Sequence, residues 1–150
     1  MKLNQDSLVT ILICTDMGLS KEMKDKYKPY TLPQWNKLAD KILNSGLGKP
    51  SSLLNAERKK IKDELNLSDA ETARLEFLLS RGANIAIEIE QLESKGIKIT
   101  TRADKDYPIR LKKVLKKYSP AVLYYSGNLK LVETAAMGVV GSRDVDEDGM

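Results

Sequence analysis

Near the C-terminal end, the chain carries a short motif whose residue types suit phosphate binding. An apolar run, Met137–Val140, leads directly into Gly141, Ser142 and Arg143. Glycine permits a tight turn, backbone N–H groups and a serine hydroxyl can face an anion, and an arginine guanidinium can grip a phosphate through two parallel hydrogen bonds. The pattern is typical of a buried strand that delivers a phosphate-binding loop to a helix N-terminus. Because every buried strand must turn, the same three residues are also compatible with an ordinary Gly-Ser turn.

A dense group of lysines could follow a phosphate backbone. Its members are Lys112, Lys113, Lys116 and Lys117. On a helix the first and third would share one face and the second and fourth the neighbouring face. This arrangement leaves Val114 and Leu115 for the core. The alternative is a solvated surface that serves solubility alone.

The charges are unevenly distributed along the chain. Residues 1–94 balance fourteen lysines and arginines against fourteen acidic residues, whereas residues 95–130 carry ten basic residues and only Asp104 and Asp106. Residues 131–150 reverse the sign, with Arg143 against five acidic residues. A concentrated basic segment is the usual electrostatic footprint of a polyanion partner.

Composition excludes several kinds of chemistry. The chain has no histidine and one cysteine, Cys14, so neither a zinc centre nor an internal disulfide is expected. The lack of histidine also removes the commonest general base, which argues against an acid–base enzyme. On this basis we expect no metal site; no catalytic residue and no cofactor are expected either. The apolar stretch Leu8–Cys14 is too short to span a bilayer, which predicts a buried helix in a cytoplasmic protein.

The first 94 residues predict a small helical domain. We expect a helix over residues 6–17 and a mobile polar connector over residues 20–30. Capping boxes at Thr31–Gln34 and Ser68–Glu71 each predict a helix start. A helix from Ser51 or Ser52 to Leu65 lies between them, Gly82 is expected to terminate the second capped helix, and Gly96 terminates the last one.

The pattern changes after Gly96. Strands are expected over residues 97–101, 121–125 and 136–140, with a helix that begins at Asp106–Pro108 and is broken by Pro120. A short helical piece over residues 129–133 precedes the third strand. Strands that alternate with helices imply parallel pairing and an α/β sheet. The predicted organisation is therefore a helical domain over residues 1–94 and the first α/β units of a second domain over residues 95–150.

The aromatic residues are expected to serve mainly in packing. Trp35 and Phe77 lie on apolar helical stripes, and Tyr107 is placed to pack a helix start. Because neighbouring strand residues point to opposite faces, at most one of Tyr124 and Tyr125 can face a given ligand.

A wider set of residues resembles the DprA/Smf family of DNA-processing proteins. In order, it comprises Gly96-Ile97, Asp104, Tyr107-Pro108, Leu111, Pro120, Val122-Leu123-Tyr124, Gly127, Val139-Val140-Gly141-Ser142-Arg143 and Gly149. Over residues 1–95 the similarity is looser and rests on Pro33-x-Trp35-x-x-Leu38-Ala39, Leu53-Leu54 and Leu78-Leu79-x-Arg81-Gly82.

The resemblance implies a SAM-like helical domain followed by a Rossmann-like domain that binds single-stranded DNA. It also implies a non-enzymatic role in transformation and recombination, in which the protein protects incoming strands and helps to load the RecA recombinase. The intact protein would be a possible homodimer. Gly141, Ser142 and Arg143 match the family loop whose arginine contacts a DNA phosphate.

Two departures from the family pattern stand out. Asp148-Gly149 replaces an aromatic-Gly pair, and the run Asp144–Asp148 places four carboxylates beside the loop. Acidic residues suit a first helical turn, but they also repel a DNA backbone within about 8–10 Å. The family's later glycine-rich loops have no counterpart in these residues, so the expected sheet is truncated. The sequence is compatible with a fragment, with a truncated reading frame and with a short natural protein.

Two other functions are compatible with the sequence. A Gly-Ser-Arg loop after a strand also resembles the entry to Rossmann enzymes of the phosphoribohydrolase type, although their second glycine-rich loop and catalytic glutamate are missing from these residues. Alternatively, the helical domain could recruit a protein partner while the α/β part remains inert.

Overall fold

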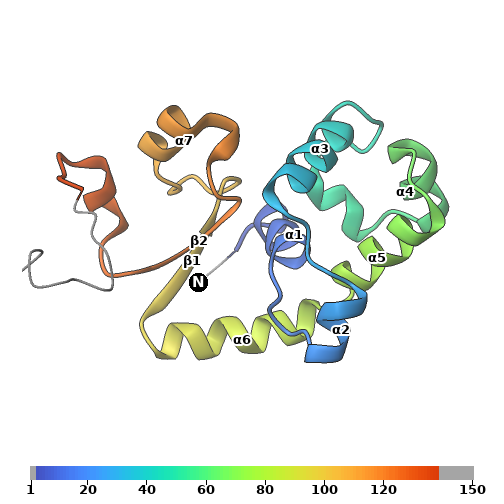
Figure 1. Ribbon diagram of the computed structural model, residues 1–150, viewed down its shortest axis with the longest axis horizontal. Coiled ribbons are helices and arrows are strands. Elements are labelled where there is room, and N and C mark those ends of the chain that lie inside the picture. The colour runs from blue at the N-terminus through green and yellow to red at the C-terminus, as the bar shows by residue number, and fades with distance from the viewer. Residues whose placement is uncertain (1–2, 139–150) are drawn as a thin grey trace, which may run out of the picture.

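The computed structural model of the chain describes residues 3–138 (Figure 1). This part is mixed α and β and mostly helical, as the sequence predicts at the level of fold class. Its α-helices are α1 (Gln5–Cys14), α2 (Lys21–Lys26), α3 (Leu32–Leu43), α4 (Arg58–Leu65), α5 (Asp69–Leu79), α6 (Gly82–Ser94) and α7 (Ile109–Leu115). The 3-10 helices are η1 (Pro50–Leu54), η2 (Lys116–Tyr118) and η3 (Leu129–Glu133), and the strands are β1 (Ile97–Thr101) and β2 (Val122–Ser126).

Helix α1 is the central element of the fold. Figure 1 shows it between the helical part of the molecule and the two strands, and it contacts η1, α3, α5, α6, β1 and β2. A helix that is apolar on most sides must be buried, and the residues from Val9 to Ile13 are all buried. The buried helix predicted from the apolar stretch is thus confirmed, although it ends at Cys14.

Two hydrophobic clusters pack against opposite sides of α1. One joins Val9 and Ile13 to residues of α3, α4 and α5, including Trp35 and Leu75. The other joins Ile11 and Leu12 to α6 and to Ile99 of β1. Each fully buried aliphatic side chain of this kind contributes about 1.5–3 kcal/mol to stability. Trp35, at 4% exposure, is a core residue as predicted.

Both predicted capping boxes are present. The Gln34 side chain accepts a hydrogen bond from the Thr31 N–H at 3.0 Å, and Glu71 accepts from the Ser68 N–H at 2.9 Å. Gly96, at φ +74°, follows the end of α6 and takes the left-handed conformation that glycine tolerates. Gly82, however, begins α6 instead of terminating α5, because Ser80 and Arg81 already turn the chain.

The predictions for two connecting segments were wrong. The expected mobile connector contains α2, which begins at a capping residue, Ser20, whose hydroxyl accepts from the Met23 N–H at 3.3 Å. Tyr27 at its end stacks on Phe77 with ring centroids 4.3 Å apart, so this segment is attached to α5. The helix expected from Ser51 is instead divided into η1 and α4.

The two strands pair antiparallel, which corrects the predicted parallel pairing. The register places Ile97 opposite Ser126 and Thr101 opposite Val122. The N–H of Arg102 donates to the carbonyl of Ala121 at 3.2 Å, so the chain re-enters the sheet at the end where β1 stops. The short α7 and η2 together return the chain to that same end, whereas a parallel pair needs a crossover to the opposite end.

The remaining expectations for residues 95–150 are only partly covered by the described residues. Residues 136–138 form no strand, and residues 139–140 lie outside the described part. Ile99 and Ala121 enter the clusters around α1. The division at residue 94 and the SAM-like and Rossmann-like assignments stay predictions.

Candidate nucleic-acid interface

The predicted phosphate-binding loop lies outside the described residues. Gly141, Ser142 and Arg143 and the acidic run after them all belong to residues 139–150. Their proposed role therefore stays a prediction, and the described part of the site is the basic segment before them.

The four clustered lysines are exposed, but they do not lie on one helix. Helix α7 ends at Leu115, and Lys116 has a positive φ of 50°, so Lys116 and Lys117 belong to η2. The prediction that Val114 and Leu115 enter the core was also wrong, because they are 69% and 36% exposed. Helix α7 ends at Leu115, before the side chains of Val114 and Leu115 can be buried against the rest of the molecule.

Two of these lysines are held in place by the fold. The Lys112 ammonium donates to the carbonyl of Arg102 at 2.8 Å and lies 5.2 Å from the ring centre of Tyr107. The carbonyl of Lys117 accepts a hydrogen bond from the Asn36 side chain at 2.8 Å. The side-chain ammonium groups of Lys113 and Lys116 form no hydrogen bond or ion pair within residues 3–138, so their charges are available to a ligand.

Tyr107 fixes the start of the basic helix, as its sequence position predicts. The side chain is 2% exposed, and its hydroxyl donates to the carbonyl of Pro120 at 2.8 Å. This bond joins the beginning of α7 to the entry of β2. Burial raises the pKa of Tyr107, so the phenol stays protonated and able to donate at neutral pH.

A groove with a basic rim separates α3 from the β1–α7 loop. The cavity has a volume of about 530 Å³. Arg102 donates to Asn36 at 2.5 Å across it, and Lys117 completes this rim. The other lining residues are Thr10, Trp35, Ala39, Asp40, Leu43, Pro50 and Ala103. The lining of the groove is therefore mixed, because its apolar residues are accompanied by two basic residues and by the Asp40 carboxylate.

Asp104 fastens the β1–α7 loop to α1. Its carboxylate accepts hydrogen bonds from the side chains of Asn4 at 2.7 Å and Ser7 at 2.5 Å, and from the Thr101 N–H at 2.8 Å. The Thr101 hydroxyl also donates to it at 3.0 Å. Asp104 belongs to the set of residues that resembles the DprA/Smf family, but the resemblance gives it no role. The sequence signal for its structural role is the Thr101-x-x-Asp104 spacing, which suits a local bond between a side chain and the backbone.

Arg110 does not contribute to the free basic surface. Its guanidinium donates to the carbonyl of Thr134 at 2.6 Å, and its backbone N–H is bonded to the Glu133 carboxylate. These bonds attach η3 to α7. Beside them lies an apolar hollow of about 510 Å³ lined by Leu111, Val114, Leu115, Leu131, Val132 and Ala136.

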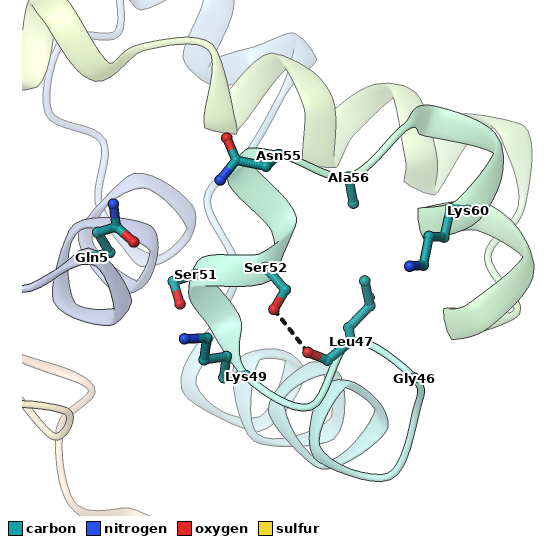
Figure 2. A pocket seen from close by; sticks show the side chains of 9 residues that line it. All are labelled: Gln5, Gly46, Leu47, Lys49, Ser51, Ser52, Asn55, Ala56 and Lys60. Atoms are coloured by element: carbon teal, nitrogen blue, oxygen red, sulfur yellow. Dashed lines mark hydrogen bonds between the residues drawn. The ribbon is translucent and has the colours of Figure 1, made fainter.

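A polar cavity lies beside η1 (Figure 2). It measures about 320 Å³, and Lys49 and Lys60 line it from different segments. Inside it, the Ser52 hydroxyl donates to the carbonyl of Leu47 at 2.8 Å. The carboxylates of Asp6 and Glu64 accept from backbone N–H groups of two lining residues, so the surroundings carry little net charge. We assign no polyanion contact to this cavity.

The described residues supply no metal centre and no activated thiol. Within residues 3–138 there is no group of three or more histidine, cysteine or acidic side chains that could hold a metal ion. Burial raises the pKa of Cys14 to about 12, so its thiol is protonated at neutral pH and is a poor nucleophile. No helix in the same range has the length and apolar character needed to cross a membrane.

Comparison with known families identifies the class of protein that the basic segment resembles. The family model of DNA recombination-mediator protein A matches residues 98–150, a range that begins in β1 and includes α7 and β2. This partial match confirms the resemblance to the DprA/Smf family over about a third of the chain. The printed description of the matched family refers to the mediation of DNA recombination. No curated protein and no solved structure matches the chain.

Proposed function

We propose that this protein binds single-stranded DNA in DNA uptake and recombination, without covalent catalysis. The observation that carries the proposal is the exposed lysine cluster of α7 and η2, which lies within the region that matches a DNA recombination-mediator family. Lysines bind the phosphate backbone without reading its sequence, so binding is electrostatic and sequence-tolerant. The proposal also assigns phosphate binding to Gly141, Ser142 and Arg143, on the strength of their residue types and of the family loop that they resemble.

The same proposal includes the partners that the resemblance implies. The protein acts in the cytoplasm, assists the RecA recombinase on the bound strand, and forms a homodimer in its intact form. It needs no cofactor for these tasks, because strand protection and loading require binding only.

The first test replaces the four clustered lysines together. We expect Lys112→Gln, Lys113→Gln, Lys116→Gln and Lys117→Gln in one chain to weaken binding to a labelled oligo-dT strand, as measured by fluorescence anisotropy. Each lost phosphate contact reduces the slope of log K against log salt by about 0.7, so two to four contacts change it by about 1.4–2.8.

The matched control removes the same charge from elsewhere. Lys21, Lys49, Lys59 and Lys60 are exposed and lie outside the basic segment. Their combined replacement by glutamine should leave the salt slope within experimental error of the original chain. Equal slopes for the two quadruple variants would show that the lysine cluster does not bind the strand.

The second test concerns the loop. We expect Arg143→Ala to weaken binding to the same strand by about 10- to 150-fold at fixed salt, because one charge-assisted hydrogen-bonding group contributes about 1.5–3 kcal/mol. Arg58→Ala, on the exposed surface of α4, serves as the control with equal charge loss. Unchanged affinity for Arg143→Ala would refute the assignment of the loop while leaving the lysine surface to be judged by its own test.

A further inference from the structure

A cavity between α1, the α2–α3 connection and β2 has no part in the basic surface. The end of α1 and the residues after it supply Cys14, Thr15 and Asp16. The connection supplies Pro29 and Tyr30 and is followed by Leu32, and the opposite wall consists of Pro120, Ala121, Val122 and Tyr124. The volume of about 660 Å³ falls in the range of small-molecule sites in proteins.

Tyr30 is an aromatic wall residue in a fixed position. Its backbone N–H donates to the carbonyl of Ile13 at 2.8 Å. The Arg74 guanidinium lies 4.2 Å from the centre of its ring, and Arg74 is itself held by bonds to the carbonyls of Lys28 at 2.6 Å and Pro29 at 3.0 Å. The arginine supports this ring from outside the cavity, because Arg74 is not among the lining residues.

Tyr124 lines the same cavity from β2. It stands opposite Ile99 in the sheet register, so its side chain lies on the sheet face that is directed toward α1, and Tyr125 lies on the other face with Lys98. Only Tyr124 of this pair borders the cavity, as expected for neighbouring strand residues, which point to opposite faces of a sheet. Its ring is 48% exposed, which leaves area free for contact.

The cavity suits a neutral ligand better than an anion. Burial raises the pKa values of Tyr30 and Tyr124, and the neighbouring Thr15 side chain opposes the rise in the pKa of Tyr124. Both phenols and the Cys14 thiol are therefore uncharged at neutral pH. The one lining carboxylate, Asp16, is paired with Lys24 at 2.6 Å. Among residues 3–138, no lysine or arginine lines the walls.

We propose that this cavity binds a nucleobase, stacked against the ring of Tyr30 or Tyr124. A base is planar, uncharged and edged with hydrogen-bonding groups, and sequence-tolerant stacking on aromatic side chains is a general mode of single-strand binding. The inference deepens the proposed function, because a strand held by the basic surface is one source of the base. A free nucleoside is the other source.

Photocrosslinking with 5-iodouracil tests the site directly. The full chain is irradiated with oligo-dT that carries 5-iodouracil, and the crosslinked peptides are identified by mass spectrometry. We expect crosslinks at Tyr30 or Tyr124. Tyr124→Leu should reduce affinity for the strand about tenfold and remove the crosslink at position 124. Tyr124→Phe keeps the aromatic ring, so it should retain both the affinity for the strand and the crosslink.

Tyr118→Leu is the matched control. Tyr118 is 69% exposed on η2 and does not line the cavity. Its replacement should leave the crosslinks at the cavity unchanged. The proposal is overturned if crosslinks in the original chain occur only outside residues 14–32 and 120–124, a result that depends on no variant and therefore on no variant's folding.

A parallel arm with free 5-iodo-2′-deoxyuridine separates this proposal from the proposed function. Crosslinks at the cavity with the nucleoside, combined with no salt-sensitive binding of oligo-dT, support the cavity and refute the strand-binding surface. Salt-sensitive strand binding without cavity crosslinks from either probe supports the surface and refutes the cavity. Cavity crosslinks from the strand but not from the free nucleoside support both the strand-binding surface and the nucleobase site, and they identify the strand as the source of the base.

Discussion

Replacing Arg81 with methionine should lower the free energy of unfolding by about 3–5 kcal/mol. Arg81 is only 4% exposed, and its guanidinium donates to the carbonyls of Leu12, Thr15, Met17 and Leu78. Three of these carbonyls lie at or just after the end of α1, where a helix leaves backbone acceptors without partners. Methionine fills part of the space but leaves the buried carbonyls unpaired, and each such loss costs about 1–3 kcal/mol.

Urea denaturation of Arg81→Met and of the original chain measures this loss of stability. Arg58→Met is the control, because Arg58 forms an exposed ion pair with Glu76 at 2.8 Å and such pairs contribute at most about 1 kcal/mol. Arg81→Lys should recover little stability, since one ammonium group cannot reach four separated carbonyls. If Arg81→Met cost no more than Arg58→Met, the bonds to α1 would not stabilise the fold.

Asp104→Ala should be the next most damaging change, with a loss of about 2–4 kcal/mol. The carboxylate is the shared acceptor for Asn4, Ser7 and Thr101. Ser7 and Thr101 are fully buried. The Thr101 hydroxyl can still donate to the Ser7 hydroxyl at 2.9 Å when Asp104 is removed, but the Ser7 hydroxyl and the Thr101 N–H lose their acceptor and cannot turn to water. Buried polar groups that lose their partners carry the full desolvation penalty.

Asp106→Ala provides a matched control two residues away. Asp106 is exposed and accepts one long hydrogen bond, from the Thr100 hydroxyl at 3.3 Å. Thermal or urea unfolding followed by circular dichroism should therefore show a small change for Asp106→Ala and a large one for Asp104→Ala. Equal shifts for the two variants would mean that the Asp104 network has no special role in joining the loop to α1.

Local sequence patterns predicted most of the individual elements. The capping boxes at Thr31 and Ser68 and the alternating run at Ile97–Thr101 each depend on neighbouring residues only, and all three are confirmed. The direction of strand pairing depends instead on where a connection returns the chain. That return is set by contacts such as the Tyr107 bond to Pro120, which no local pattern contains.

Charged residues were the main source of error. The lysine-rich segment after Ser20 suggested a mobile loop, but the contact of Tyr27 with Phe77, fifty residues later, accompanies an ordered helix. Arg81 and Arg74 gave no sequence signal for their roles, because an arginine that bonds backbone carbonyls looks like any surface arginine in the sequence. The basic surface was easier to predict, since its charge is a property of composition. The loop at residues 141–143 stays a prediction.

The central position of α1 has a consequence for synthesis on the ribosome. Helix α1 is synthesised well before the segments that cover it, because Ile11 and Leu12 pack against α6 and β1, and Ile99 follows them by about ninety residues. At roughly 5–20 residues per second, the apolar N-terminal segment waits about 5–20 s for these partners. During that interval its exposed side chains are a natural substrate for a chaperone that recognises short apolar segments on nascent chains.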